Sequence, residues 1–138
     1  MSKKNWQVRV AGVLAALLLS AGCVETVLLS AGAAAALGSY KWIEGTMEKD
    51  YPRPMQDCYN ACLAACKNLN LKIASQAYNP LESRIEAAQP DGTAVKIHLI
   101  SRPNNITTVK VRFGMMGNLD YSGYFHRRVM HNLGLPAE

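Results

Sequence analysis

Three stretches of the chain alternate apolar and polar residues with a period of two. They run from Ser83 to Ala87, from Val95 to Leu99 and from Val109 to Phe113. This alternation is typical of strands with one buried and one exposed face. The pattern therefore predicts three half-buried strands, with Ile85 and Ile97 among the residues on the buried face.

Two short polar segments between these strands have the residues of tight hairpin turns. In Pro90-Asp91-Gly92, proline and aspartate suit a type I turn and glycine suits the left-handed position that follows it. Pro103-Asn104-Asn105 is compatible with the same turn, since asparagine tolerates the left-handed conformation at Asn105. Such turns fix the strand register. The expected cross-strand pairs are Ile85–Ile97, Glu86–Lys96, Leu99–Val109 and Ile97–Val111.

Helical spacing appears on either side of the three strands. Apolar residues recur at three- and four-residue steps from Met55, after Pro54, and the pattern ends near 68–70. A second helix is expected to begin near Asp120, a good N-cap residue, and to end at Gly134. Further strands are expected at 42–51 and 71–73. The order β-α-β-β-β-β-α predicts an α+β fold, a two-layer domain with an antiparallel sheet and both helices on one face.

The first 22 residues have the three parts of a secretory signal peptide. Lys3, Lys4 and Arg9 precede the apolar segment 10–19, and small residues at 20–22 precede Cys23. A cysteine directly after small residues resembles a bacterial lipobox, although Ser20 stands where leucine is usual. The resemblance implies cleavage before Cys23 and lipidation of its thiol. The sequence thus predicts a signal peptide at 1–22.

The alternative for this segment is an uncleaved membrane anchor. The apolar stretch from Val10 to Val24 would span about 22 Å as a helix, whereas a bilayer core is about 30 Å thick. Cleavage is therefore the preferred interpretation. Val24 follows the cysteine, and resemblance to proteobacterial sorting signals implies the outer membrane, because aspartate there retains lipoproteins in the inner membrane.

The segment 23–41 is predicted to be a juxtamembrane tether that joins the lipidated cysteine to a single domain at 42–138. It is rich in alanine and glycine from Thr26 to Gly38, and the interfacial residues Tyr40, Lys41 and Trp42 lie at its junction with the domain. Two interpretations remain open: the tether lies on the membrane leaflet, or it packs on its own domain.

The charge of the chain changes once the leader is set aside. The 138 residues have a formal net charge of +5, but loss of the three basic leader residues leaves 12 basic and 10 acidic side chains, or +2. A bulk positive charge is therefore no argument for nucleic-acid binding. We expect no nucleic-acid partner.

Turn and core positions along the mature chain resemble a family of small bacterial lipoproteins that is defined only as a domain of unknown function. The similar positions are Tyr51-Pro52, Asp91-Gly92-Thr93, and Val111-Arg112-Phe113-Gly114 with Gly117. The resemblance implies this fold and a location in the cell envelope. It implies no reaction, because none is assigned to the family.

The residues with chemical potential do not form a recognisable catalytic or metal motif. Cys58, Cys62 and Cys66 share one helical stripe, where a core role is preferred over a disulfide or a metal site, since CxxC pairs and nearby histidines are missing. His126 and His131 are on different faces of their helix. Asp120 and Ser122 near His126 lack a nucleophile elbow. We expect no catalytic site, metal or cofactor.

The exposed face of the sheet is predicted to be basic. Its candidate anion-binding residues are Arg84, Lys96, Lys110 and Arg112, with Lys72 and Arg102 nearby and Glu82 and Glu86 opposing them. One-sided charge attracts anionic partners, which in an envelope are lipid headgroups, peptidoglycan or an acidic protein; the alternative is an ordinary solvated face.

Together these features predict a non-enzymatic lipoprotein of the cell envelope. Its acyl chains would hold it on the periplasmic face of the outer membrane, where its domain would act as a structural or interaction module. The alternative is an envelope protein that binds an anionic lipid, glycan or protein through its basic face.

Overall fold

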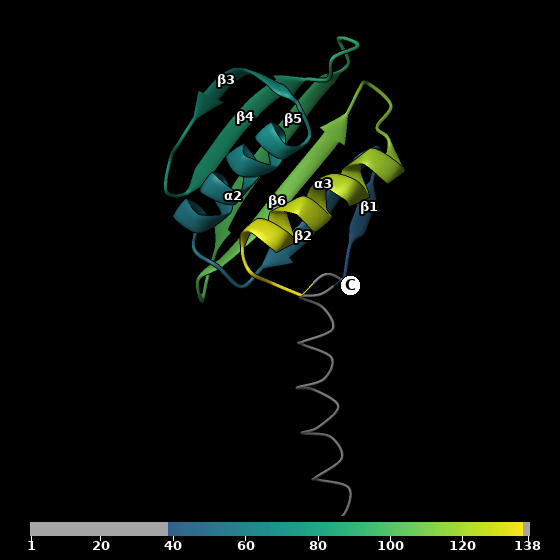
Figure 1. Ribbon diagram of the computed structural model, residues 1–138. Helices are drawn as coiled ribbons and strands as arrows, with labels where there is room; N and C mark the ends of the chain where they lie inside the picture. The colour runs from purple at the N-terminus through teal and green to yellow at the C-terminus, as the bar shows by residue number, and fades with distance from the viewer. Residues whose placement is uncertain (1–38, 137–138) are drawn as a thin grey trace, which may run out of the picture. The chain divides into compact units, whose positions relative to one another are not determined.

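A computed structural model describes residues 39–136, which form a six-stranded antiparallel sheet and two helices (Figure 1). The strand order across the sheet is β1-β2-β6-β5-β4-β3. The elements are β1 (Lys41–Ile43), β2 (Thr46–Tyr51), α2 (Met55–Asn68), β3 (Lys72–Ala77), β4 (Glu82–Ala88), β5 (Ala94–Arg102), β6 (Ile106–Phe113) and α3 (Leu119–Asn132).

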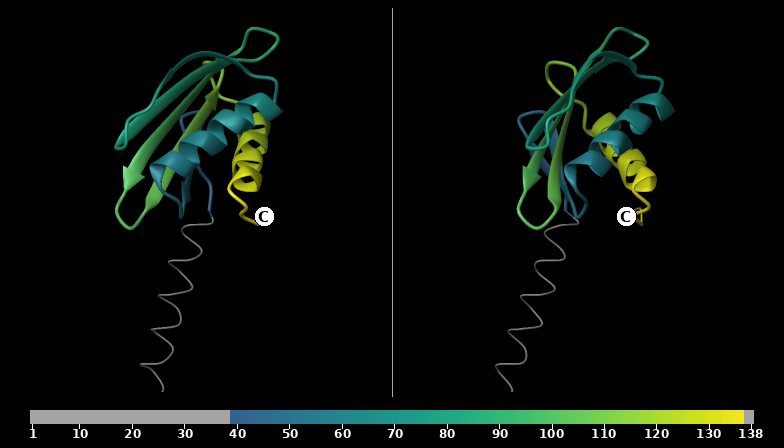
Figure 2. Two further views of the ribbon diagram at one scale, coloured as in Figure 1. Left: turned by 60° about the vertical axis from the view of Figure 1, so that its left-hand side comes forward. Right: turned by 90° about the vertical axis from the view of Figure 1, so that its left-hand side faces the viewer.

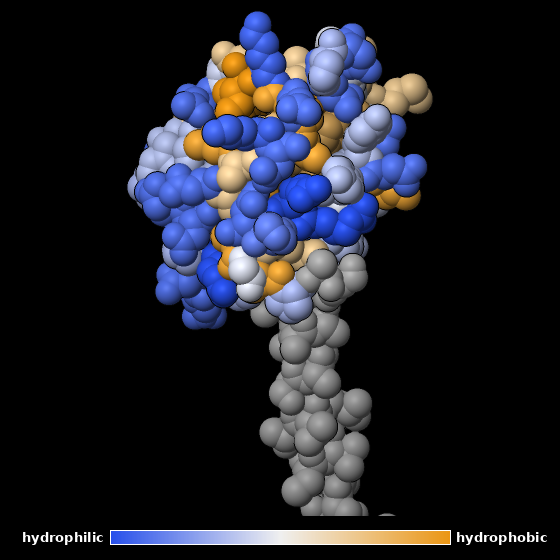
Figure 3. Space-filling model, viewed as in Figure 1, coloured by the Kyte–Doolittle hydropathy of each residue, from blue (hydrophilic) through white to orange (hydrophobic). Residues whose placement is uncertain are grey.

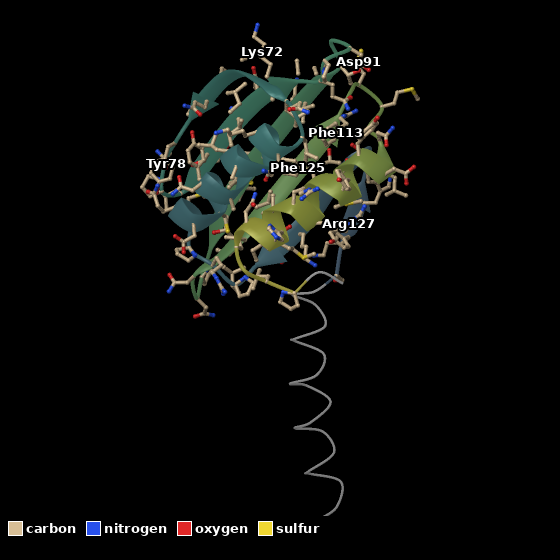
Figure 4. All side chains as sticks on the ribbon, viewed as in Figure 1. Lys72, Tyr78, Asp91, Phe113, Phe125 and Arg127 are labelled. Carbon is tan, nitrogen blue, oxygen red and sulfur yellow. The ribbon has the colours of Figure 1, made fainter. Side chains whose placement is uncertain are left out.

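Both helices lie on the same face of the sheet, and the opposite face is open to solvent (Figure 2). The sequence-based fold is therefore confirmed: an α+β domain of two layers. The sheet residues that face the helices are buried, because alternate positions of β4, β5 and β6 point toward α2 and α3. Phe113 of β6 and Phe125 of α3 meet edge-on in this layer, with ring centroids 6.3 Å apart (Figure 4).

The predicted strand at 42–51 is a hairpin of two strands. Glu44 and Gly45 form its turn, with φ angles of 48° and 83°. Two left-handed residues in succession are what a tight hairpin turn requires. β2 then pairs with β6, so that the beginning of the domain lies next to its last strand.

The predicted hairpin registers are confirmed. Ile85 pairs with Ile97 and Glu86 with Lys96, and the backbone N–H of Gln89 donates to Thr93 O across the β4–β5 turn at 2.9 Å. The β5–β6 register likewise has the expected pairs. Its turn differs in detail, because Asn104 and Asn105 both have positive φ, at 63° and 54°, whereas only Asn105 was expected to be left-handed.

The first helix begins where expected and the second begins slightly earlier. α2 begins at Met55, and Pro54 is its N-cap with extended backbone angles. The N-cap of α3 is Asn118 and not Asp120, because the Asn118 side chain accepts the backbone N–H of Tyr121 at 3.1 Å. Asp120 lies in the first turn, where a carboxylate is also favourable.

Candidate functional site

The open face of the sheet carries a row of charged side chains that crosses five strands. Cross-strand pairing aligns Glu48 of β2, Lys110 of β6, His98 of β5 and Arg84 of β4, with Lys41 of β1 beyond Glu48. All four predicted anion-binding residues lie on this face. The structure adds β2 next to β6, which the sequence did not indicate.

Two of the four predicted residues are paired with carboxylates. Glu82 contacts both Arg84 and His98, with nitrogen–oxygen distances of 2.7 Å each, and Glu48 contacts Lys110 at 2.8 Å. Hydrogen bonds from Arg84 and from His98 lower the pKa of the Glu82 carboxyl. These carboxylates offset the repulsion between like charges in the row, so Arg84 and Lys110 are less available to an anion than expected.

The predicted charge balance of this face needs a correction. Because β2 joins the sheet beside β6, Glu48 and Asp50 also point to the open face. Thr108 donates to Asp50 Oδ1, and Arg102 Nε donates to Thr108 Oγ1 at 3.0 Å. The basic character is therefore weaker at the end of the face that carries the β5–β6 turn.

Lys96 and Arg112 are two neighbouring cations of this face that have no ion-pair partner among the described residues. They lie directly opposite each other on β5 and β6. Glu86 is opposite Lys96 on its other side, but its carboxylate accepts from Ser75 Oγ at 3.3 Å. Arg112 donates to the Met115 carbonyl oxygen. Two adjacent cations without a carboxylate are suited to hold an anionic group between them.

A shallow recess of about 340 Å³ adjoins this cation pair. Its walls come from β5, β6 and the start of the following loop: Ala94, Lys96, Arg112, Gly114 and Met115. The recess thus combines two cations with the side chain of an exposed methionine.

The three cysteines of α2 lie in the core. Cys58, Cys62 and Cys66 are free thiols with no exposed surface, as the core interpretation requires. Burial raises the pKa of Cys58 and of Cys66 to about 11 and that of Cys62 well above its ordinary value, so the reactive thiolate is disfavoured at neutral pH.

A buried hydrogen-bonded histidine was not foreseen from the sequence. His126 of α3 has no exposed surface, and its Nε2 lies 3.2 Å from Met47 O, which can only accept. The proton therefore belongs on Nε2, and Nδ1 accepts from the Tyr51 hydroxyl at 2.7 Å. Burial lowers the pKa of His126 to about 4, and burial raises that of Tyr51. The pair bridges α3 and β2 as a neutral unit.

The residues near His126 do not form a catalytic triad. Asp120 is exposed on the first turn of α3, and Ser122 Oγ is buried and has no hydrogen-bond partner among residues 39–136. His131 is exposed, so it does not share a site with His126. Within the part of the chain that the structure describes, no group of three His, Cys, Asp or Glu side chains is placed to hold a metal ion.

The end of the predicted tether packs with the domain. Tyr40 meets the His126 ring edge-on at a centroid distance of 5.6 Å and lies 4.2 Å below the ammonium of Lys49. Lys49 itself is 4% exposed, on the helix side of β2. Tyr40 thus shields a buried lysine. Cys23, the predicted lipidation site, lies outside the described residues, as do the signal peptide and most of the tether.

None of the helices within residues 39–136 has the length and apolar character needed to cross a bilayer. The protein is a small two-layer α+β domain with an open, partly basic sheet face. Its three thiols and His126 are buried in the core. The chain belongs to a family of proteins of unknown function, DUF3568, whose pattern matches residues 7–132. This match confirms the resemblance to a domain of unknown function. No curated protein matches the chain.

Proposed function

We propose that the protein is a lipid-anchored component of the bacterial cell envelope, with a non-enzymatic domain that serves as a structural or interaction module. The observation that carries this proposal is the small-residue segment 20–22 followed by Cys23, after a basic and apolar leader. The family match covers residues 7–132, a range that includes most of the leader and Cys23. Val24 supports the outer membrane as the location.

A non-enzymatic role is supported by where the reactive groups lie. The three thiols of α2 are buried and protonated, and His126 is neutral and hydrogen-bonded inside the core. General acid–base catalysis needs a group that reaches its substrate with a pKa near the working pH. The buried thiols and His126 meet neither condition, which favours a binding or structural task for the domain.

Replacement of Cys23 with alanine is expected to abolish lipidation and processing. Without the thiol no acyl chain can be attached, so the variant should accumulate as a longer precursor that incorporates no labelled palmitate. Gel mobility and metabolic labelling of whole cells would measure both effects. Serine at Cys58, a buried cysteine, is the matched control and should leave processing intact. Normal cleavage of the Cys23→Ala chain would contradict the proposal.

A second function, binding of an anionic envelope partner, is favoured by the unpaired cations Lys96 and Arg112. Loss of one charge-assisted hydrogen bond weakens binding about tenfold. The double variant Lys96→Glu with Arg112→Glu should therefore lose about a hundredfold in affinity for lipopolysaccharide or cell-wall fragments at low salt. Sedimentation of the detergent-solubilised full chain with each ligand would measure this.

The matched control reverses the two cations that already have carboxylate partners. Arg84→Glu with Lys110→Glu makes the same change in net charge on the same face. If the Lys96–Arg112 pair forms the site, the control should retain more binding, and wild-type binding should weaken with salt. If the wild type and both double variants bind equally and salt has no effect, the exposed sheet face is an ordinary solvated face.

A further inference from the structure

The loop that joins β6 to α3 exposes two methionines almost completely. Met115 and Met116 are each 90% exposed, and Leu119 and Tyr121 follow with more than half of their surface open to solvent. Apolar side chains project from this end of the domain, next to polar ones (Figure 3). The cost of leaving such side chains in water makes the loop a candidate contact surface.

The backbone that carries the two methionines packs closely against the β1–β2 turn. Gly45 of the β1–β2 turn packs against it so closely that an added Cβ would lie 2.4 Å from Met116 O, and one on Gly117 would lie 2.1 Å from Gly45 O. Both glycines also have positive φ. Arg112 donates to the Met115 carbonyl from the other side. The loop therefore projects its two side chains from a backbone that is in contact on both sides.

The neighbourhood of the loop combines these apolar side chains with unpaired positive charge. Met115 lines the same recess as Lys96 and Arg112, and neither of these cations forms an ion pair with a carboxylate among the described residues. Glu44 and Asp120 lie on the segments that flank the loop. The attraction for an anion therefore comes from the cation pair itself and not from the net charge of this end.

We propose that the β6–α3 loop is a membrane-contact element, in which Met115 and Met116 enter the acyl region of a bilayer while Lys96 and Arg112 bind anionic lipid headgroups. Apolar side chains beside a basic pair are what interfacial binding requires. The methionines project outward, and unbranched projecting side chains suit a fluid phase, which needs no matching pocket. This proposal rests on the proposed lipid anchor in one respect: the anchor determines which membrane the loop meets.

The length of the tether allows this contact. The loop lies at the end of the domain opposite to the one where β1 begins (Figure 1). The segment from Cys23 to Ser39 can extend over at most about 55 Å. This reach lets the domain turn its β6–α3 end toward the leaflet that would hold the acyl chains.

The test is a polarity-sensitive fluorophore at the loop in the full mature chain, reconstituted into vesicles. Met116→Cys provides the attachment point, because the native thiols of α2 are buried, and Leu81→Cys, an exposed site on the β3–β4 connection, is the control. Vesicles contain phosphatidylcholine alone or with phosphatidylglycerol. We expect a shift to shorter emission wavelength and quenching by spin-labelled acyl chains only at position 116, and only with phosphatidylglycerol. Lys96→Glu with Arg112→Glu should remove both signals.

Flotation of the vesicles separates this proposal from the anchor. If the chain floats but the label at 116 stays in water with both lipids, the loop proposal is wrong, the anchor stands and a protein partner becomes the better occupant. If the charge-reversed chain still inserts its label, headgroup recognition is wrong. If the chain fails to float with neutral vesicles but inserts the label into anionic ones, the loop proposal holds and the anchor fails.

Discussion

Replacement of Cys62 with aspartate is expected to unfold the domain, whereas alanine at the same position should cost only about 2 kcal/mol. Cys62 lies in the middle of the buried stripe of α2 and has no exposed surface. Alanine removes one buried sulfur atom. Aspartate places a carboxyl group among apolar side chains, at a cost on the order of 5 kcal/mol, which is comparable to the whole stability of a small domain.

Urea denaturation followed by circular dichroism would measure both effects. Asn60→Asp, on the exposed side of the same helix, is the control and should change stability by less than about 0.5 kcal/mol. A Cys62→Asp domain with wild-type stability would show that this stripe of α2 is not core. It would also return the three thiols to consideration as a chemical site.

Acidification from pH 6.5 to pH 4 is expected to destabilise the domain by about 3 kcal/mol through His126 alone. Burial lowers the pKa of this imidazole from its ordinary value of 6.5 to about 4. Between these values the unfolded chain binds the proton and the folded chain does not, so stability falls as the pH falls. Each pH step of one across this window costs up to about 1.4 kcal/mol, and the loss ends below pH 4.

The pH dependence can be assigned with two variants. His126→Gln lowers stability because the Tyr51 hydroxyl loses its closer acceptor, Nδ1, and keeps only the backbone carbonyl of residue 126 at 3.3 Å; the stability of this variant should change much less between pH 6.5 and 4. His98→Gln alters a partly exposed histidine that contacts Glu82, and this variant should keep the wild-type loss of stability. Stability measured by urea denaturation at several pH values tests this. An unchanged pH profile in His126→Gln would mean that another group is responsible.

Local features of the sequence were enough to predict much of the sheet. The β4–β5 register follows from the parity of Ile85 and Ile97 and from the turn at Pro90-Asp91-Gly92, because turn and strands are adjacent in the chain. The core position of Cys62 follows from helical spacing in the same way. In both cases the signal is local, because all the residues that produce it lie within about twenty positions of one another in the sequence.

What the sequence did not predict depends on contacts between distant segments. The pairing of β2 with β6 joins residues about sixty positions apart, so the acidic Glu48 could not be placed beside Lys110. The hydrogen bond of Tyr51 with His126 has the same cause. Burial of Lys49 is not expected from its charged side chain. It involves the Tyr40 ring, which lies against the Lys49 ammonium only in the folded domain. Asn118 and Asp120 are both good caps, and only geometry distinguishes them.

The close packing of Gly45 on Gly117 has a consequence for the order in which the chain can fold. β2 has no partner besides the short β1 until β6 has been synthesised, since the sheet places it between these two strands. Until then the apolar side of the first hairpin, with Met47 and Tyr51, has nothing to cover it. Local pairs such as β4–β5 and β5–β6 can form early, but the first hairpin closes over a long intervening chain, a slow step. The two glycines therefore come into contact only at the last stage of folding. The first hairpin and the last part of the domain are then expected to fold together, as one cooperative unit.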